Sequence, residues 1–496
     1  MTFFILSFIS LLTLTFAHKD PHYVNGRTVM VHLFEWKFVD IAKECEDFLG
    51  PMGYGGVQVS PVNENLVIEN RPWYERYQPI SYKIITRSGN GAEFKDMVTR
   101  CNKVGVRIYV DAIINHMSGN AQPAYGTGGT SAKPQKLSYP GVPYTSKDFN
   151  HPICTIQNYK NATEVRNCEL SGLHDLDQSK QRVRRKIINY FNKLIDYGVA
   201  GFRIDAAKHM WPRDLEAIYK KIKRLSPKNG FPKNAESYIY QEVIDLGGEA
   251  VSKFEYNKRA SVIEFLPGII LGEMFREKDN LARLQAFGNG SIWRLIPSED
   301  ALTMVDNHDN QRGHGAGGAS ILTHKDPKPY KMAITFMLAH PYGNARVMSS
   351  FEFTDPSQGP PANSDGSIIS PEIVDGQCVN GWVCEHRWPQ IYRMVRFRNL
   401  VNGEDIKNWW SNGKNQIAFS RGNKGFVAFN VEGFDLHEQL QTGLPAGQYC
   451  DIITGDVING KCSGKSVVVD NAGNADINII TNELEGALAL HIQAKL

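Results

Sequence analysis

Short apolar runs alternate with longer segments of helical periodicity through most of the chain. A strand buried on both faces is a near-continuous apolar run, whereas a surface helix repeats its apolar positions every three to four residues. Eight runs fit the first description: Val29–Leu33, Gly56–Val59, Arg107–Asp111, Gly201–Ile204, Tyr238–Gln241, Val262–Phe265, Leu302–Val305 and Arg346–Ser349. Helical patterns between them cover Phe38–Leu49, Ala92–Val104, Ser179–Tyr197, Pro212–Leu225 and Pro329–Leu338. Alternating strands and helices predict a parallel sheet, and eight such units predict a closed (β/α)8 TIM barrel.

The alternation breaks after the third strand and again near residue 400. Residues 115–177 are rich in Gly, Pro, Ser, Thr and Tyr without a helical period, and a plain loop of this length is uncommon. We therefore expect an inserted subdomain at 115–177 in a barrel formed by 18–114 and 178–400. Short β-type runs between turn residues predict an antiparallel β-sandwich domain at 401–496: Gln416–Ser420, Gly425–Asn430, Val467–Val469 and Ala487–Ile492.

The N-terminal residues 1–17 are almost wholly apolar or Ser/Thr and end in Thr15-Phe-Ala17, a small-residue cleavage pattern. This composition predicts a secretory signal peptide cleaved near Ala17/His18 and a secreted, extracellular protein. The alternative is a buried N-terminal strand or helix. The run is too short to cross a membrane comfortably, and no later stretch is long enough, so we expect no membrane partner.

Eight cysteines fit an oxidising compartment. They allow about 105 pairings, so the sequence alone does not fix the disulfides. Neighbours in the sequence suggest Cys154–Cys168, Cys378–Cys384 and Cys450–Cys462, which leaves Cys45 with Cys101. Asn161 and Asn289 head acceptor motifs for N-glycans, which matter only if the chain is secreted.

The net charge is only +3 over 496 residues, and 42% of the residues are hydrophobic. This is ordinary globular composition, and the charge balance gives nucleic-acid binding no support. We expect a monomer that binds neither nucleic acid nor membrane.

Charged residues interrupt the apolar pattern of residues 199–209. Arg203 lies inside the fourth predicted strand, and Asp205 follows that strand directly. A buried Arg is costly unless it is paired or binds an anion. An Arg–Asp ion pair without a catalytic role is one interpretation; the other is chemistry at the carboxyl end of a barrel strand.

Acidic residues recur at the ends of the predicted strands: Asp111, Asp205, Glu242, Asp306 and Asp309. Clustered like charges are unfavourable, so packing does not explain them. Glycoside hydrolysis needs such a group, because one carboxylate attacks or stabilises the sugar while a second, protonated one donates to the leaving oxygen.

Several motifs carry a resemblance to a known family. Four segments resemble the signature regions of the alpha-amylase family: Asp111–His116 (DAIINH), Gly201–His209 (GFRIDAAKH), Glu242 in its strand and Val305–Asp309 (VDNHD). Others resemble the animal-type, chloride-dependent members: His32–Trp36 (HLFEW), Gly53–Asn63 (GYGGVQVSPVN), Gln241–Glu249 (QEVIDLGGE) and His308–Gly315 (HDNQRGHG). The resemblance covers essentially the whole chain after residue 17.

The resemblance implies roles for individual residues. Asp205 would be the nucleophile, Glu242 the general acid and then base, and Asp309 the stabiliser of the transition state. The outcome would be retention of configuration. The substrate-binding residues carried over from the family are Trp73, Tyr74, Tyr77, Gln78, His116, Lys208, His209, His308 and His314. Tyr74 stands where the family usually has a second Trp, which puts the strength of outer-subsite stacking in doubt.

The resemblance also implies two bound ions. Arg203, Asn307 and Arg346 match the chloride ligands, against the alternative that both arginines pair with barrel acids. One structural Ca2+ would bind Asn115, Asp175 and the backbone carbonyls of Arg166 and His209; oxygen ligands suit this cation. Because Asn115 and Asp175 flank the insertion, the ion would tie it to the fourth strand.

The function implied is a secreted, endo-acting alpha-amylase that hydrolyses internal α-1,4 bonds of starch and glycogen. An exo-acting enzyme or a transglycosylase is the alternative within the class. A non-catalytic binding or storage homologue is the alternative outside it, and such a protein would usually lack one of the three acids.

Overall fold

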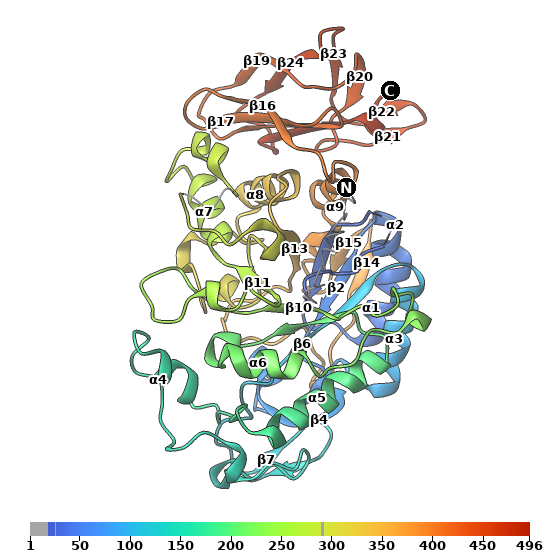
Figure 1. Cartoon of the computed structure of the whole chain (residues 1–496). Helices are drawn as coiled ribbons and strands as arrows, with labels where there is room; N and C mark the ends of the chain where they lie inside the picture. Colours follow the sequence, from blue (N-terminus) through green and yellow to red (C-terminus); the bar gives the residue numbers. More distant parts are fainter. Residues whose placement is uncertain (1–17, 25, 289–291) are drawn as a thin grey trace, which may run out of the picture.

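The computed structural model describes residues 18–24, 26–288 and 292–496, and its central feature is a closed barrel of parallel strands (Figure 1). The strands follow one another around the barrel in the order β1-β13-β12-β11-β10-β9-β6-β2. Their bounds are β1 Val29–Leu33, β2 Gly56–Val59, β6 Arg107–Ala112, β9 Gly201–Ile204, β10 Tyr238–Gln241, β11 Ser261–Glu264, β12 Ala301–Thr303 and β13 Asn344–Ser349. The predicted (β/α)8 barrel is confirmed.

Helices surround the barrel on the outside (Figure 1). They are α1 Phe38–Glu44, α2 Gly50–Met52, α3 Gly91–Lys103, α5 Gln181–Asp196, α6 Pro212–Tyr219, α7 Leu266–Met274, α8 Pro327–Ala339 and α9 Pro389–Leu400. The start of α3 shows how local sequence sets these bounds. Asn90 accepts hydrogen bonds from the N–H groups of Ala92 and Glu93, and the Glu93 carboxylate accepts from the Asn90 N–H, which forms a capping box.

Two predicted helices differ from those observed. The helix expected at 38–49 changes at Cys45 into a π-helical turn, Cys45–Leu49. The helix expected at 212–225 ends at Tyr219. Lys220, Lys221, Lys223 and Arg224 follow, and like charges three or four residues apart disfavour helix continuation.

The segment between β6 and β9 contains two short strands, β7 Ala124–Tyr125 and β8 Ser131–Ala132, and the short helix α4 Ala162–Asn167. The loop after β2 holds part of this segment through β3 Asn63–Asn65, β4 Pro79–Thr86 and β5 Gly89–Asn90. The Glu64 carboxylate accepts from the N–H groups of Gly128 and Thr130, both at 3.0 Å. These bonds anchor the segment to the barrel. Its exact boundaries stay a prediction.

The C-terminal part is all β, as predicted, and consists mainly of two four-stranded antiparallel sheets. One sheet contains β16 Ile406–Ser411, β17 Gln416–Arg421, β18 Gly425–Asn430 and β25 Ala487–His491. The other contains β19 Leu436–Gln441, β24 Asn474–Ile479, β23 Ser466–Val469 and β20 Gly447–Cys450. Two small hairpins lie outside these sheets: β21 Val457–Ile458 with β22 Lys461–Cys462 in the C-terminal part, and β14 Glu372–Val374 with β15 Gln377–Val379 before it.

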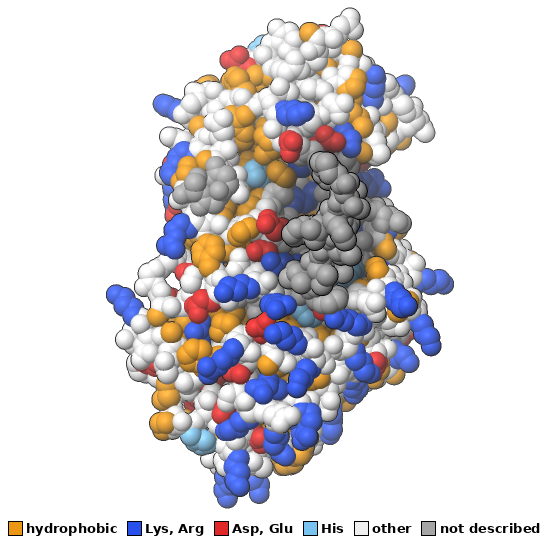
Figure 2. All heavy atoms as spheres, viewed as in Figure 1, with side chains coloured by type: hydrophobic (Ala, Val, Ile, Leu, Met, Phe, Trp, Pro, Cys, Tyr) orange, Lys and Arg blue, Asp and Glu red, His pale blue; other side chains and the backbone are white. Residues whose placement is uncertain are grey.

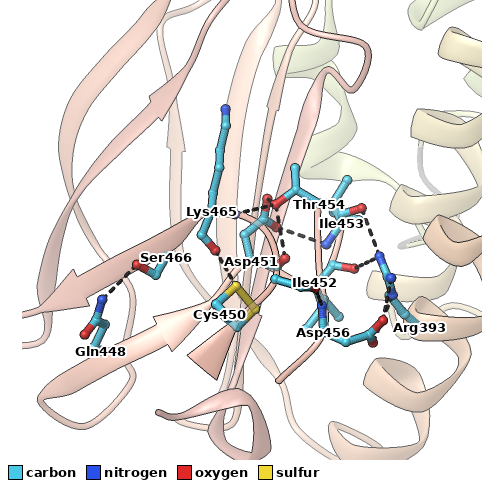
Figure 3. Close-up of a disulfide and its surroundings, with 12 residues drawn as sticks. Arg393, Gln448, Cys450, Asp451, Ile452, Ile453, Thr454, Asp456, Lys465 and Ser466 are labelled. Carbon is cyan, nitrogen blue, oxygen red and sulfur yellow. Dashed lines mark hydrogen bonds and ion pairs between the residues drawn. A yellow bond between two sulfur atoms is a disulfide. The ribbon is translucent and has the colours of Figure 1, made fainter. Parts of the chain in front are cut away.

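Arginines join the C-terminal domain to the barrel. Arg393 of α9 donates to both carboxylate oxygens of Asp456, at 3.1 and 2.5 Å, beside the Cys450–Cys462 disulfide (Figure 3). Within the barrel, Arg398 of α9 donates to the carbonyls of His340 and Gly343, just beyond the end of α8. Arg421 of β17 donates to the last carbonyl of α8, at Ala339. Two buried guanidinium groups thus bind the carboxyl end of one helix, where its dipole favours cations.

Four disulfides are present: Cys45–Cys101, Cys154–Cys168, Cys378–Cys384 and Cys450–Cys462. This is the pairing that the spacing suggested. Within the described ranges, no helix combines the length and apolarity needed to span a bilayer. The predicted signal peptide, residues 1–17, lies outside the described residues.

Basic side chains gather over α5 and α6 in the lower part of the molecule (Figure 2). Exposed members of this surface are Arg182, Arg185, Lys193, Arg213, Lys220, Lys221, Lys223 and Lys228. The small net charge of the whole chain conceals this local excess of positive charge.

Candidate active site

Arg203 is a buried guanidinium at the carboxyl end of the barrel strands. It is paired in register with Asp111 of β6, and its Nη1 donates to Asp111 Oδ1 at 2.6 Å. The same nitrogen donates to Asp205 Oδ1 at 2.8 Å, and Nη2 donates to Glu242 Oε1 at 2.5 Å. The structure therefore contains the ion pairs between Arg203 and the barrel acids that were one interpretation of the sequence. One cation holds three carboxylates from the neighbouring strands β6, β9 and β10.

The backbone fixes Asp205 and Glu242 on either side of this cation. Glu242 directly follows β10, and its N–H donates to the Ile204 carbonyl at 3.0 Å. Ala206 has a left-handed backbone with φ of 49°, and its N–H donates to Glu242 Oε2 at 2.8 Å. Strained residues of this kind persist where the surroundings hold them, often at active sites. The turn after β9 thus orients the carboxylate that follows β10.

Asp309 is held by a turn that follows β12. The Asn307 Oδ1 accepts from the N–H groups of Asp309, at 3.0 Å, and Asn310, at 2.7 Å. Asn310 Oδ1 accepts from the Asn307 N–H at 2.7 Å. His308 Nε2 lies 3.3 Å from Asp309 Oδ2. Side-chain bonds from both asparagines therefore fix the Asp309 turn, and Asp309 lines the cleft.

Burial and mutual repulsion change the acidity of this group. Burial, followed by repulsion from Glu242, raises the pKa of Asp205 well above its usual range and that of Asp309 to about 7. Burial also raises the pKa of Asp111, against the lowering effect of Arg203. Burial thus favours the protonated form of each of these carboxyl groups, whereas the Arg203 guanidinium favours the ionised form. Such a group supplies both an acid and a carboxylate base or nucleophile.

A cleft of about 540 Å3 lies over these carboxylates. All three predicted catalytic residues line it. So do seven of the predicted substrate-binding residues: Trp73, Tyr74, Tyr77, His116, Lys208, His209 and His314. Residues brought together from the strand ends, the inserted segment and the loop after Asp309 thus share one concave site, which is typical of enzyme active sites.

Two predicted substrate-binding residues lie behind the wall of the cleft. The ring of His308 stacks on Tyr77, with centroids 5.2 Å apart. Burial lowers the pKa of His308 well below the usual range. The Gln78 Oε1 accepts from the Gly119 N–H at 3.1 Å and so holds the inserted segment. In this structure His308 supports a ring that lines the cleft, whereas Gln78 holds the inserted segment.

The cleft also contains residues that the sequence analysis gave no role: Tyr159, Leu170, Ser171, Leu173, Ala206, Ile244, Glu249 and Gly315. Glu249 forms an ion pair with Lys208, whose Nζ lies 5.0 Å from the centroid of the Tyr159 ring. Glu249 ends one of the motifs quoted above, which was the available signal. Tyr159 and Leu170 had none, because the inserted segment has no periodic pattern.

The residues predicted to bind calcium fit a hard cation. Asp175 pairs with His116 in a β-bridge next to Asn115, and the Oδ1 atoms of Asn115 and Asp175 are buried and accept no hydrogen bond from the described residues. His209 Nδ1 donates to the Val165 carbonyl at 2.9 Å, which brings its turn against α4, where Arg166 lies. Unsatisfied buried oxygens are rare, and a cation with oxygen ligands would satisfy both.

The residues predicted to bind chloride include a second buried cation. Arg346 of β13 is 2% exposed, and among the described residues it forms no ion pair; its Nη1 donates to Gln58 Oε1 at 2.6 Å. Burial lowers its pKa, and the nearby charge of Arg203 lowers it further. Two neighbouring buried guanidinium groups, one lacking a carboxylate partner, suit a small anion between them. Asn307 holds the Asp309 turn through its side-chain oxygen.

Of the two glycosylation motifs, Asn161 is exposed and its side chain caps α4 by accepting from Thr163 N–H at 3.1 Å. Asn289 lies outside the described residues.

A parallel barrel with acidic side chains grouped at the strand ends is the arrangement of barrel glycoside hydrolases. The alpha amylase catalytic domain model matches residues 44–291, and the model of the alpha amylase C-terminal all-beta domain matches residues 409–493. The chain is 57% identical to an alpha-amylase of Tribolium castaneum over 98% of this chain and 99% of the relative. It is 55% identical to an alpha-amylase-related protein of Drosophila atripex over 97% of each chain. The chain belongs to the alpha-amylase family, as its motifs predicted.

A solved structure of alpha-amylase I from Eisenia fetida, a variant in complex with maltohexaose, is similar throughout. The TM-score is 0.92 at 44% identity, over 95% of this chain and 99% of that chain.

Proposed function

We propose that this protein is a secreted, endo-acting alpha-amylase that hydrolyses internal α-1,4-glucosidic bonds of starch and glycogen with retention of configuration. The observation that carries the proposal is the shared guanidinium of Arg203, which fixes Asp205 and Glu242 beside each other under the cleft. The maltohexaose in the Eisenia fetida complex supports an α-glucan as the ligand. The presence of all three acids argues against a non-catalytic homologue.

The reaction follows from the positions of the acids. The Asp205 carboxylate attacks the anomeric carbon while protonated Glu242 donates its proton to the glycosidic oxygen, so that one glucan chain leaves and a β-glycosyl-enzyme forms. Glu242, now a carboxylate, takes a proton from water. The water oxygen attacks the same carbon, releases Asp205 and gives the α-configured product. Asp309 and His116 hold the hydroxyls of the reacting sugar.

We propose one structural Ca2+ at Asn115, Asp175 and the carbonyls of Arg166 and His209. When bound, it would clamp the inserted segment against the turn that follows β9. We propose one activating Cl− at Arg203, Asn307 and Arg346. A negative charge near Glu242 would favour its protonated form, as an acid catalyst requires. The four disulfides support an extracellular location, and a monomer is the proposed state.

The test is a digest of soluble starch by the wild type and by Glu242→Gln. We expect the variant to lose at least about a thousandfold in kcat, because the acid that protonates the leaving group is gone. Glu216→Gln, on the outer helix α6, is the matched control and should retain activity. Mixed oligosaccharide products support endo-action, whereas maltose alone would favour the exo-acting alternative. Near-normal turnover by Glu242→Gln with an unchanged circular dichroism spectrum would refute the assignment.

A further inference from the structure

Arg312 is a buried cation that lies directly behind the active site. It is 5% exposed, and among the described residues it forms no ion pair. Its Nε and Nη2 atoms are buried and have no hydrogen-bond partner in the part of the chain that the structure describes. A buried, unpaired guanidinium costs folding free energy, so its presence calls for an explanation.

Aromatic rings enclose this guanidinium. Its central carbon lies 4.1 Å from the ring centroid of Phe353, 4.8 Å from Phe351, 5.2 Å from Phe34 and 5.9 Å from Trp73. The ring faces attract the cation and restrict its plane. Trp73 lines the cleft, so Arg312 packs against the back of a substrate-facing ring.

The remaining bonds of Arg312 go to the turn that carries the transition-state residue. Its Nη1 donates to the His308 carbonyl at 3.0 Å, and its own N–H donates to the Asp309 carbonyl at 3.0 Å. The His308 ring in turn packs on Phe34, with centroids 5.1 Å apart, and on Trp73, at 5.5 Å. The Arg312 side chain therefore contacts the backbone of the His308–Asp309 turn on one side and the surrounding aromatic rings on the other.

We propose that Arg312 is a positioning residue for glucan hydrolysis, which joins the His308–Asp309 turn to the Trp73 platform and keeps both in their reactive arrangement. The inference rests on the proposed function. Arg312 does not line the cleft, so it acts through its neighbours and not by touching the substrate.

The charge of Arg312 gives the inference a measurable signature. Arg312 lowers the pKa of Asp309, against the raising effects of burial, Glu242 and Asp111, and alongside the lowering effect of Arg203. The acidic groups that face Arg312 are Asp309 on its own loop, Glu35 after β1, Glu385 in the turn before α9, and Tyr77. Its charge also lowers the pKa values of three nearby histidines, His32, His308 and His324. Removing the cation should therefore raise the pKa of Asp309, and the acid limb of the pH profile should move to higher pH.

The experiment measures kcat and KM for maltoheptaose against pH in the wild type, Arg312→Met and Arg312→Lys. We expect Arg312→Met to lose about tenfold to a hundredfold in kcat, since small misplacements cost this much, with little change in KM. Its acid limb should shift upward. Arg312→Lys restores the charge but not the planar contacts, so its acid limb should return towards that of the wild type while kcat stays low.

Arg107→Met is the matched control. Arg107 starts β6 at the opposite end of the barrel, lies 4.2 Å from the Phe231 ring centroid and donates to the Gly230 carbonyl at 2.7 Å. This variant should lose stability but keep its pH profile. Wild-type kcat and an unshifted acid limb in Arg312→Met would overturn the inference. If Arg312→Met does not fold, Arg312→Lys decides, because a normal kcat there contradicts the need for planar contacts.

Titration of the Asp309 carboxyl carbon by NMR separates this inference from the proposed function. An inactive wild type would refute the function, whereas the carboxyl titration still reports on Arg312. Equal Asp309 pKa values in the wild type and Arg312→Met would overturn the coupling.

Discussion

Asp309 shows at the residue scale how catalytic need opposes stability. Burial, then repulsion from Glu242, raises its pKa to about 7, above the ordinary value near 3.8. The folded protein therefore binds this proton more tightly than the unfolded chain does. Ionisation of Asp309 between about pH 4 and pH 7 costs folding free energy, so its contribution to stability falls as the pH rises through that window.

We predict that Asp309→Asn is inactive but at least as stable as the wild type above pH 7. The amide has the shape of the carboxyl group and cannot ionise. The folding free energy that ionisation of Asp309 costs is therefore not lost in the variant. Thermal unfolding should show equal melting temperatures near pH 4 and a gain of about 1–4 °C at pH 8. If the melting temperature of Asp309→Asn, measured relative to that of the wild type, is lower at pH 8 than at pH 4, the predicted destabilisation by ionised Asp309 is wrong.

Arg346 carries the prediction about chloride. Its guanidinium is buried without an ion pair among the described residues and lies near Arg203. Adding NaCl to a halide-free preparation should raise kcat several-fold, whereas sodium gluconate at equal ionic strength should not. Arg346→Gln should weaken the response. An equal response to both salts would indicate screening and not a bound anion.

At the scale of elements, the inserted segment and the turn after β9 form one unit, which is joined through helix α4 of the segment. The Oδ1 atoms of Asn115 and Asp175, which lack a partner among residues 18–24, 26–288 and 292–496, point to a cation that holds this unit together. We predict that excess chelator lowers the melting temperature and that added Ca2+ restores it, since a ligand bound only by the folded state stabilises that state.

Asp175→Asn tests the assignment of this site. Its melting temperature should depend less on chelator than that of the wild type. A wild-type melting temperature that excess chelator leaves unchanged would count against the calcium site. Full recovery by Mg2+ alone would argue for a different cation, because Mg2+ demands a tighter octahedral site.

The barrel strands could be predicted because each is a short apolar run, and all eight were found within about two residues of the expected bounds. Helices α7 and α9 were missed. Residues 266–274 of α7 are nearly all apolar, so they have no polar face that would mark a helix. Helix ends were least predictable, as the early end of α6 shows, because tertiary packing and local charge decide them.

The acids at the strand ends could be predicted because a parallel barrel gathers all carboxyl ends at one face. The walls of the cleft could not, since Tyr159 and Leu170 come from a segment without periodicity. Arg312 was also missed as a supporting residue. It stood in a quoted motif, but nothing in the sequence indicates that four separate aromatic residues would enclose it.

At the scale of the whole molecule, charge is unevenly distributed. The net charge of +3 suggests an almost neutral particle, yet the outer surface of α5 and α6 is strongly basic. Such asymmetry affects association with charged surfaces and not the fold. A composition average cannot reveal it, because the average sums charges over the whole chain.

The arginines at the end of α8 determine how the molecule comes apart. Arg421 of the C-terminal domain binds the helix terminus that Arg398 binds from within the barrel, so the C-terminal domain cannot separate without exposing the buried carbonyl of Ala339. The two domains should therefore melt as a single cooperative unit, with one calorimetric peak. Arg421→Met should split that peak into two, whereas Lys424→Met, on a half-buried turn of the same domain, should not. Two peaks in the wild type would mean that the domains are thermodynamically independent. If they are coupled, a heated solution would hold intact enzyme or unfolded chain, and few molecules with a working barrel and a lost C-terminal domain.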